Sequence, residues 1–291
     1  MRPAMTDAVG LPPASPRRRF ALAVPALRPG LWLGLAFVLF LATCALAPQV
    51  FATHDPLAIL VREKLQPPGP GHWFGTDHLG RDVYSRLVYG TGNSLLATFI
   101  AVAIGLAAGS LLGLVSGTAP RAVDAAFMRV VDVMLAIPNL LLSLAIVTAL
   151  GFGLVPVAIA VGIGSIGSFA RLMRAEVLRV KGLTFVESTE LLGASKPYVI
   201  LRHVLPHAVG PVLALATIEF GTAVLSVSSL SFLGFGAPPP AMEWGLLIAE
   251  GRKFINVGWW LILFPSLVIV ATVLATNHLG HALEEHHGRA P

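Results

Sequence analysis

The chain has 291 residues and a net charge of +5, and 55% of its residues are hydrophobic while only 12% are charged. A soluble domain of this length carries about 25% charged residues, so the composition excludes an ordinary soluble protein and indicates an integral membrane protein. The basic residues flank long apolar runs, which argues against nucleic-acid binding, and the single cysteine, Cys44, excludes an internal disulfide bond.

The N-terminal segment combines a proline-rich tail with a long apolar run. We expect residues 1–28 to be a disordered cytoplasmic tail, because they lack the apolar content of a packed core. The run over residues 31–51 could be a signal peptide, but it is too long for one, and Pro48 would directly follow the cleavage site. We therefore predict that residues 29–52 form an uncleaved first transmembrane helix.

Residues 53–93 are more polar and are predicted to form an external loop. The first half of this loop is rich in proline and glycine, which is typical of irregular structure. In the second half, from Asp77 to Tyr89, apolar residues recur four positions apart. This spacing predicts a short amphipathic helix on the outer membrane surface.

Further apolar runs predict a five-helix core over residues 94–277. The stretch from Val133 to Ala170 has no charged residue and is long enough for two helices, with a turn near Gly151. The expected helices cover residues 94–117, 130–150, 154–170, 208–231 and 257–277. Residues 278–291 are expected to be a cytoplasmic tail, and its histidines have no cysteine or aspartate beside them, so we predict no metal site.

Charge sets the expected orientation of these six spans. With both termini in the cytoplasm, most lysine and arginine residues fall on the cytoplasmic side, as the positive-inside rule requires. The internal segment 171–206 is strongly basic, and it would face outward if residues 133–170 formed a single span. The rule therefore supports two helices in that stretch.

Three features within or beside the predicted spans suggest specific contacts. Glycines recur four residues apart in the helix 94–117, a spacing that lets membrane helices approach closely, and the partner is either this chain or a second subunit. Glu219 lies near the middle of the helix 208–231, where an ionisable group costs about 3 kcal/mol, so it is a candidate for the translocation path or a hydrogen-bonded packing residue. Arg129 and Asp132 are predicted to form an ion pair.

The sequence shows no site for nucleotide or catalysis. It has no G-x-x-x-x-G-K-[ST] loop, and the G-x-G-x-x-G match over residues 162–167 lies inside an apolar span rather than in a soluble βαβ unit. We therefore predict that the chain is not an enzyme, binds no cofactor and has no catalytic residue.

The basic segment 171–206 shows helix start and stop signals. Residues 176–192 have helical spacing, and Gly193 is a natural stop because glycine tolerates the left-handed conformation. Ser195 can cap a second helix with Pro197 in its first turn. We predict that this second helix covers about residues 196–205, and that Pro206 separates it from the following span.

The spacing E-x5-G-x9-H-x-L-P over residues 187–206 resembles the cytoplasmic "EAA" coupling loop of ABC-importer permease subunits. The segments 74–86, 128–138 and 230–245 are similar to the second permease subunit of the dipeptide, oligopeptide and nickel class of these importers. Where that family usually has two alanines, this chain has Ser188 and Thr189; both are small, so we expect the docking surface to be kept.

The resemblance implies an all-α integral membrane protein with the six-transmembrane-helix type I ABC importer permease fold, in the bacterial inner membrane. It implies four partner subunits besides lipid: a second homologous permease subunit, two ATP-binding subunits that hold ATP and Mg²⁺, and an external solute-binding protein. Di- or oligopeptides are the expected cargo, and nickel, glutathione or another small solute stay open. The competing class is an ATP-independent secondary transporter or channel, for which only Glu219 argues.

The resemblance also implies which residues act. The coupling loop would use Glu187, Ser188, Thr189, Gly193, Ser195, Pro197, Tyr198, His203, Leu205 and Pro206. An external gate or binding-protein contact would use Asp77, Arg81, Asp82, Arg86, Pro239 and Trp244.

Overall fold

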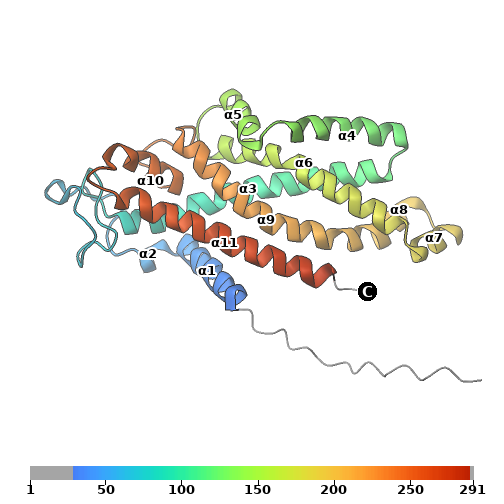
Figure 1. The fold of residues 1–291 in the computed structure, drawn as a ribbon, viewed down its shortest axis with the longest axis horizontal. Helices are drawn as coiled ribbons and strands as arrows, with labels where there is room; N and C mark the ends of the chain where they lie inside the picture. Colours follow the sequence, from blue (N-terminus) through green and yellow to red (C-terminus); the bar gives the residue numbers. More distant parts are fainter. Residues whose placement is uncertain (1–28, 289–291) are drawn as a thin grey trace, which may run out of the picture.

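The structure, a computed structural model, describes residues 29–288, and the predicted tail 1–28 lies outside them. The described part of the chain is an elongated bundle of helices (Figure 1). Residues 52–82 and helix α10 (Trp244–Gly251) lie at one end, called here the loop end. Helices α7 (Thr184–Leu191) and α8 (Lys196–Val199) lie at the opposite end, called here the α7 end.

The first apolar segment is broken near its end. Helix α1 covers Pro29–Leu46, and a short helix α2 covers Pro48–Phe51. The predicted helix 29–52 is therefore not continuous, because Pro48 begins α2 and forces Ala47 out of the helical conformation. Its 18 residues make α1 slightly shorter than the roughly 20 that cross the hydrocarbon core.

The predicted amphipathic helix on the membrane surface is wrong. Helix α3 (Val83–Thr118) runs for 36 residues without a break, and its first turns contain the apolar positions that suggested a separate helix. Leu87 and Val88 are buried in the bundle. Asp82 fixes the start of α3, because its side chain accepts a hydrogen bond from the Ser85 N–H.

The predicted span 130–150 is not one continuous helix. The chain forms α4 (Arg121–Ala136) and α5 (Asn139–Leu150), which are bent by 96°. Pro138 explains the bend, because it holds Ile137 in an extended conformation and has no N–H for a continuing helix. Among the described helices, four are long and apolar enough to span a membrane, or five if this bent pair is one span.

Helix α6 (Leu154–Lys181) packs along α3 through the glycine stripe. A Cβ atom added to Gly109 would lie 2.6 Å from the Ile166 carbonyl oxygen, and one added to Gly113 would collide with the Ala170 carbonyl. The described structure therefore uses these glycines for close packing within the chain. This α3–α6 pair forms the centre of the main apolar core together with α9 (Leu205–Phe232).

The segment after α7 differs from the prediction. Helix α8 continues through a π-helical turn, Ile200–Val204, directly into α9, so Pro206 does not separate two helices. In the wider turn the Leu205 N–H donates to the Ile200 carbonyl, which provides a way to continue the helix past a proline. The bundle is completed by the 3₁₀ turns Val61–Glu63 and Arg252–Phe254 and by α11 (Trp260–Gly288).

Candidate functional site

Helix α7 ends as the sequence predicted. Gly193 has φ +87°, in the left-handed region, and the Ala194 N–H donates to the Thr189 carbonyl at 3.3 Å. This is the long hydrogen bond of a Schellman motif. The predicted single helix over residues 176–192 is interrupted, however, because α6 ends at Lys181 and α7 starts at Thr184.

The α7 end exposes large apolar side chains. Leu191 and Leu192 are each 88% exposed, beside the turn at Gly193. Three valines of the same region are almost fully buried in the bundle and fix it to the core: Val186, Val199 and Val204. A tip that is fixed to the core and presents exposed leucines is suited to contact with another protein.

Aromatic and histidine rings connect α7 with the π-helical turn. The ring of His203 lies 6.2 Å from that of Phe185 on α7 and 5.7 Å from that of Tyr198 on α8, with edge-to-face geometry at both. His207 lies 5.4 Å from Phe185. The two halves of the predicted coupling loop are therefore in direct contact and can move as one body.

Most of the other predicted coupling residues are exposed or make hydrogen bonds only to nearby residues. Glu187 is exposed in the first turn of α7, and the hydroxyls of Ser188 and Thr189 donate to carbonyls one turn back, at 2.7 Å. Ser195 occupies the N-cap position of α8, but its side chain makes no capping bond. The remaining three lie in or next to α8 and α9: Pro197 and Pro206 are exposed and Leu205 is half-buried.

At the loop end, charged residues predicted to be external contacts form a buried network. Asp77 Oδ2 accepts hydrogen bonds from Arg81 Nε at 2.6 Å and from Arg86 Nη1 at 2.8 Å. Glu250 from α10 also bonds Arg86, at 2.8 Å. Burial opposes the charged form of Asp77, but N–H donors of Arg81 and Leu79 and both guanidinium groups outweigh it, so the Asp77 pKa is lowered.

Glu243, which the sequence reasoning missed, joins α3 to α10. It is 1% exposed and caps α10, accepting from the N–H groups of Gly245 and Leu246 at 3.0 and 2.9 Å. Ser94 donates to the same carboxylate and accepts from the Trp244 N–H at 3.1 Å. Glutamate is not one of the residues that usually cap helices, so the sequence contains only the weaker signal of an acidic residue near a helix start.

Burial limits what the predicted external residues can touch. Asp77, Arg81, Asp82, Arg86 and Trp244 are each at most 4% exposed, and only Pro239 is exposed. Beside them lies an open groove of about 880 Å³, lined by Leu57, Ile59, Leu233, Pro239, Phe254 and neighbouring residues. A contact with a protein outside the bundle would involve this groove rather than the buried charges.

Two predictions inside the bundle have different outcomes. Glu219 is half-buried on α9, and the Thr222 hydroxyl lies 2.9 Å from its carboxylate, which leaves its role untested. The predicted pair of Arg129 with Asp132 is wrong: Asp132 binds Arg171 on α6, at 2.7 Å, because α4 packs against α6.

Four or five of the described helices are long and apolar enough to span a membrane, which indicates a multi-pass membrane protein. Residues 109–290 match the family described as binding-protein-dependent transport system inner membrane component, and the chain belongs to this family. It is a permease subunit of a binding-protein-dependent ABC importer in the inner membrane and is not itself an enzyme. Such permeases generally work with a partner permease, a binding protein, and ATPases that use ATP and Mg²⁺.

Relatives and a solved structure support this placement. The chain is 39% identical to the probable D,D-dipeptide transport system permease protein DdpC of Escherichia coli K12, covering 85% of this chain and 83% of the relative. It is 38% identical to the glutathione transport system permease protein GsiD of Pectobacterium atrosepticum, covering 92% and 88%. A structure of the inward-facing MetNI methionine ABC transporter aligns with TM-score 0.58 and 20% identity, covering 70% of this chain and 97% of that one, which shows a shared fold.

Proposed function

We propose that this permease imports short peptides and that its segment 171–206 is the cytoplasmic dock for an ATP-binding subunit. Both termini are then cytoplasmic, and the loop end faces outward. This orientation places the basic segments on the cytoplasmic side. The proposed organisation is a tail (1–28), a first membrane segment (29–52), an external loop (53–93), a core (94–277) and a cytoplasmic tail (278–291).

The exposed pair Leu191 and Leu192 carries the docking proposal. These two leucines are the most exposed large apolar side chains in the described structure. On a surface that faces the cytoplasm they lack lipid contacts, so a partner groove is their favourable environment. Glu187 at the start of α7 and the Gly193 turn shape this dock, and Tyr198 extends it onto α8.

A continuous helix can carry the motion of the dock across the membrane. From Lys196 to Phe232 the chain is one run of 37 helical residues, and its far part contacts α10 at the loop end. A movement of the ATP-binding subunit would tilt this run as a rigid body and alternate the openings on the two sides. Glu219 lies on the same run and is our candidate for the lining of the path.

At the opposite end, we assign the groove beside Pro239 to contact with the solute-binding protein. The groove is open and has exposed apolar side chains, including Ile59 and Leu233, which a partner can cover. The buried charges around Arg86 act as the rigid support of this surface. Binding outside and ATP hydrolysis inside are then coupled reciprocally through the helices.

The double substitution Leu191→Asp with Leu192→Asp tests the dock. In the assembled complex in proteoliposomes, we expect substrate-stimulated ATP hydrolysis and uptake to fall at least about tenfold, since two charges would enter an apolar contact. Val61→Asp is the matched control, because Val61 is also largely exposed but lies at the loop end. Normal ATP hydrolysis and uptake in the double variant would refute the docking assignment.

The substrate class requires its own test. The relatives named above carry dipeptide and glutathione in their names, and glutathione is itself a tripeptide, which supports peptides as cargo. We expect labelled dipeptides to be taken up in an ATP-dependent way and competed by other short peptides. If the complex takes up Ni²⁺ and added peptides do not compete with this uptake, a metal importer of the same class would be favoured instead.

A further inference from the structure

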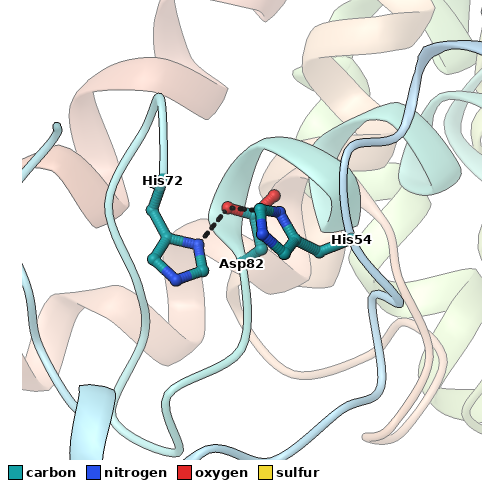
Figure 2. Close-up of side chains that lie close together, drawn as sticks. All are labelled: His54, His72 and Asp82. Atoms are coloured by element: carbon teal, nitrogen blue, oxygen red, sulfur yellow. Dashed lines mark hydrogen bonds and ion pairs between the residues drawn. The ribbon is translucent and has the colours of Figure 1, made fainter. Parts of the chain in front are cut away.

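Two histidines and the aspartate that caps α3 meet at the loop end (Figure 2). His72 Nδ1 lies 2.8 Å from Asp82 Oδ1, and His54 Nδ1 lies 3.9 Å from the same oxygen. One ligand atom from each residue lies within 4.8 Å of the other two. The three residues lie at separate points of the segment between α2 and α3, and the path of this segment brings them together.

Each of the three is held in place by other contacts. The backbone N–H groups of Thr53 and His54 donate to Ser85 Oγ, at 3.2 and 3.0 Å. Asp82 Oδ2 accepts from the Ser85 N–H at 2.7 Å, which leaves Oδ1 to face the two rings. Such fixed backbone and side-chain positions are what a metal site needs, because little ordering is left for the ion to impose.

Glu63 gives His72 the orientation of a metal ligand. His72 Nε2 lies 3.0 Å from Glu63 Oε2, so the ring stands between two carboxylates. A neutral imidazole has one N–H; when Nε2 donates to Glu63, the Nδ1 lone pair faces Asp82 Oδ1. Two electron-rich atoms at that distance need a cation between them, either a second proton or a metal ion. A carboxylate behind the outer nitrogen is the usual companion of a metal-bound histidine.

We propose that His54, His72 and Asp82 bind a divalent transition-metal ion with Zn²⁺-like preferences, and that Glu63 orients His72. Two imidazoles and one carboxylate with further positions left to water are typical ligands for such ions. The carboxylates of Asp82 and Glu63 balance the two charges of the ion and offset the positive end of α3. His54, whose side chain is 40% exposed, gives the ion a route from solvent.

The two ligand separations that involve Asp82 need only small adjustments, and the separation between the two histidine nitrogens, within 4.8 Å, would also shorten. Metal–ligand bonds of about 2.0–2.1 Å in a tetrahedral site separate ligand atoms by about 3.3 Å. The His72–Asp82 separation would widen slightly, and the His54–Asp82 separation would shorten by a similar amount. Side-chain rotations supply such shifts, while Ser85 keeps the backbone fixed. The bound ion would tie the segment after α2 to the start of α3 and so close the loop end.

A proton competes with the metal at His72. Burial lowers the pKa of His72, but its hydrogen bonds to Asp82 and Glu63 outweigh that, so the pKa is raised above the ordinary value. Metal binding must displace this proton, and the affinity is therefore expected to fall as the pH decreases.

Titration with Co²⁺ and Zn²⁺ tests the site in full-length protein purified with a histidine-free tag. The tail residues His278, His281, His286 and His287 are replaced by glutamine to remove their background. We expect one equivalent of Co²⁺ with visible absorption bands, displaced by Zn²⁺. His54→Gln and His72→Gln should each weaken binding at least about tenfold, and Glu63→Gln should weaken it about tenfold while keeping the bands.

His78→Gln is the matched control, because His78 lies in the same loop but stacks on Phe254, with ring centroids 5.0 Å apart. It should leave Co²⁺ affinity and spectrum unchanged. The proposal is overturned if no saturable Co²⁺ band appears in the parent protein, as expected when the cluster holds only a proton. Equal affinity in His54→Gln, His72→Gln and the parent protein would also overturn it.

Discussion

At the loop end, charged side chains are buried and paired within the chain, whereas at the α7 end apolar side chains are exposed and have no cover. Arg86 is 1% exposed and bonded to two carboxylates, while Leu191 is 88% exposed. Burying a charge and exposing a large apolar side chain both cost free energy unless neighbouring groups offset that cost. At the loop end, the opposite charges that offset it belong to the same chain.

The contrast shows which parts of this subunit are complete in isolation. Asp77, Glu250 and Glu243 bind their neighbours within the chain, so the charged core of the loop end forms without a second protein. The groove beside Pro239 at the same end stays open to a partner. The α7 end is rigid underneath, where Val199 and Val204 are buried, but its surface is complete only against a partner. Substitutions of the buried loop-end charges should therefore change stability, and those at the exposed α7 end should change coupling.

The largest effect is expected from Arg86→Met. It removes one of the two guanidinium groups that Asp77 and Glu250 share and leaves Arg81 alone to balance both carboxylates. Breaking a pair in such a largely buried network costs about 3–5 kcal/mol of unfolding free energy. Arg171→Met is the control, since the Arg171–Asp132 pair is exposed and worth at most about 1 kcal/mol. Denaturant titration of the purified protein measures the unfolding free energy of both variants. Equal losses of unfolding free energy would show that the buried charges contribute no more to stability than the exposed pair.

Two glycines with similar backbone angles offer a sharper comparison. Gly80 has φ +82° and Gly193 has φ +87°, but a Cβ at Gly80 would collide with the Leu60 carbonyl, while one at Gly193 meets nothing within 4 Å. Gly80→Ala should cost about 2–4 kcal/mol from strain and overlap together. Gly193→Ala should cost about 1 kcal/mol from strain alone. In transport assays Gly193→Ala should lower uptake more than its stability loss explains, and a larger stability loss than that of Gly80→Ala would contradict this ranking.

Local signals in the sequence predicted the parts of the fold that depend on local chemistry. Apolar runs located the membrane segments because hydration cost is set by each segment's own composition. Gly193 predicted a helix end because its backbone freedom is intrinsic to the residue. Pro138 is also a local signal, because proline has no N–H and restricts the residue before it, whereas the long uncharged stretch around it fits a straight or a bent span equally well.

The contacts between distant residues could not be predicted in the same way. Arg86 and Glu250 are 164 residues apart, and nothing near either one indicates the other. The cluster of His54, His72 and Asp82 has no motif spacing, since the loop path alone brings it together. The continuous helix through Pro206 depends on a π-helical turn that packing of Val204 stabilises, and no sequence pattern indicated it.

The smallest effect is expected at a helix cap. Ser195 stands at the N-cap of α8, yet its hydroxyl makes no capping bond, so Ser195→Ala should change the unfolding free energy by less than about 0.5 kcal/mol. Glu243 caps α10 with two hydrogen bonds, and Glu243→Ala should cost about 1–3 kcal/mol because buried N–H groups lose their acceptor. Denaturant titrations of both variants compare the caps directly. If Ser195→Ala lowered the unfolding free energy as much as Glu243→Ala, side chains within the chain would be stabilising the α7 end. The argument that this end needs a partner protein would then fail.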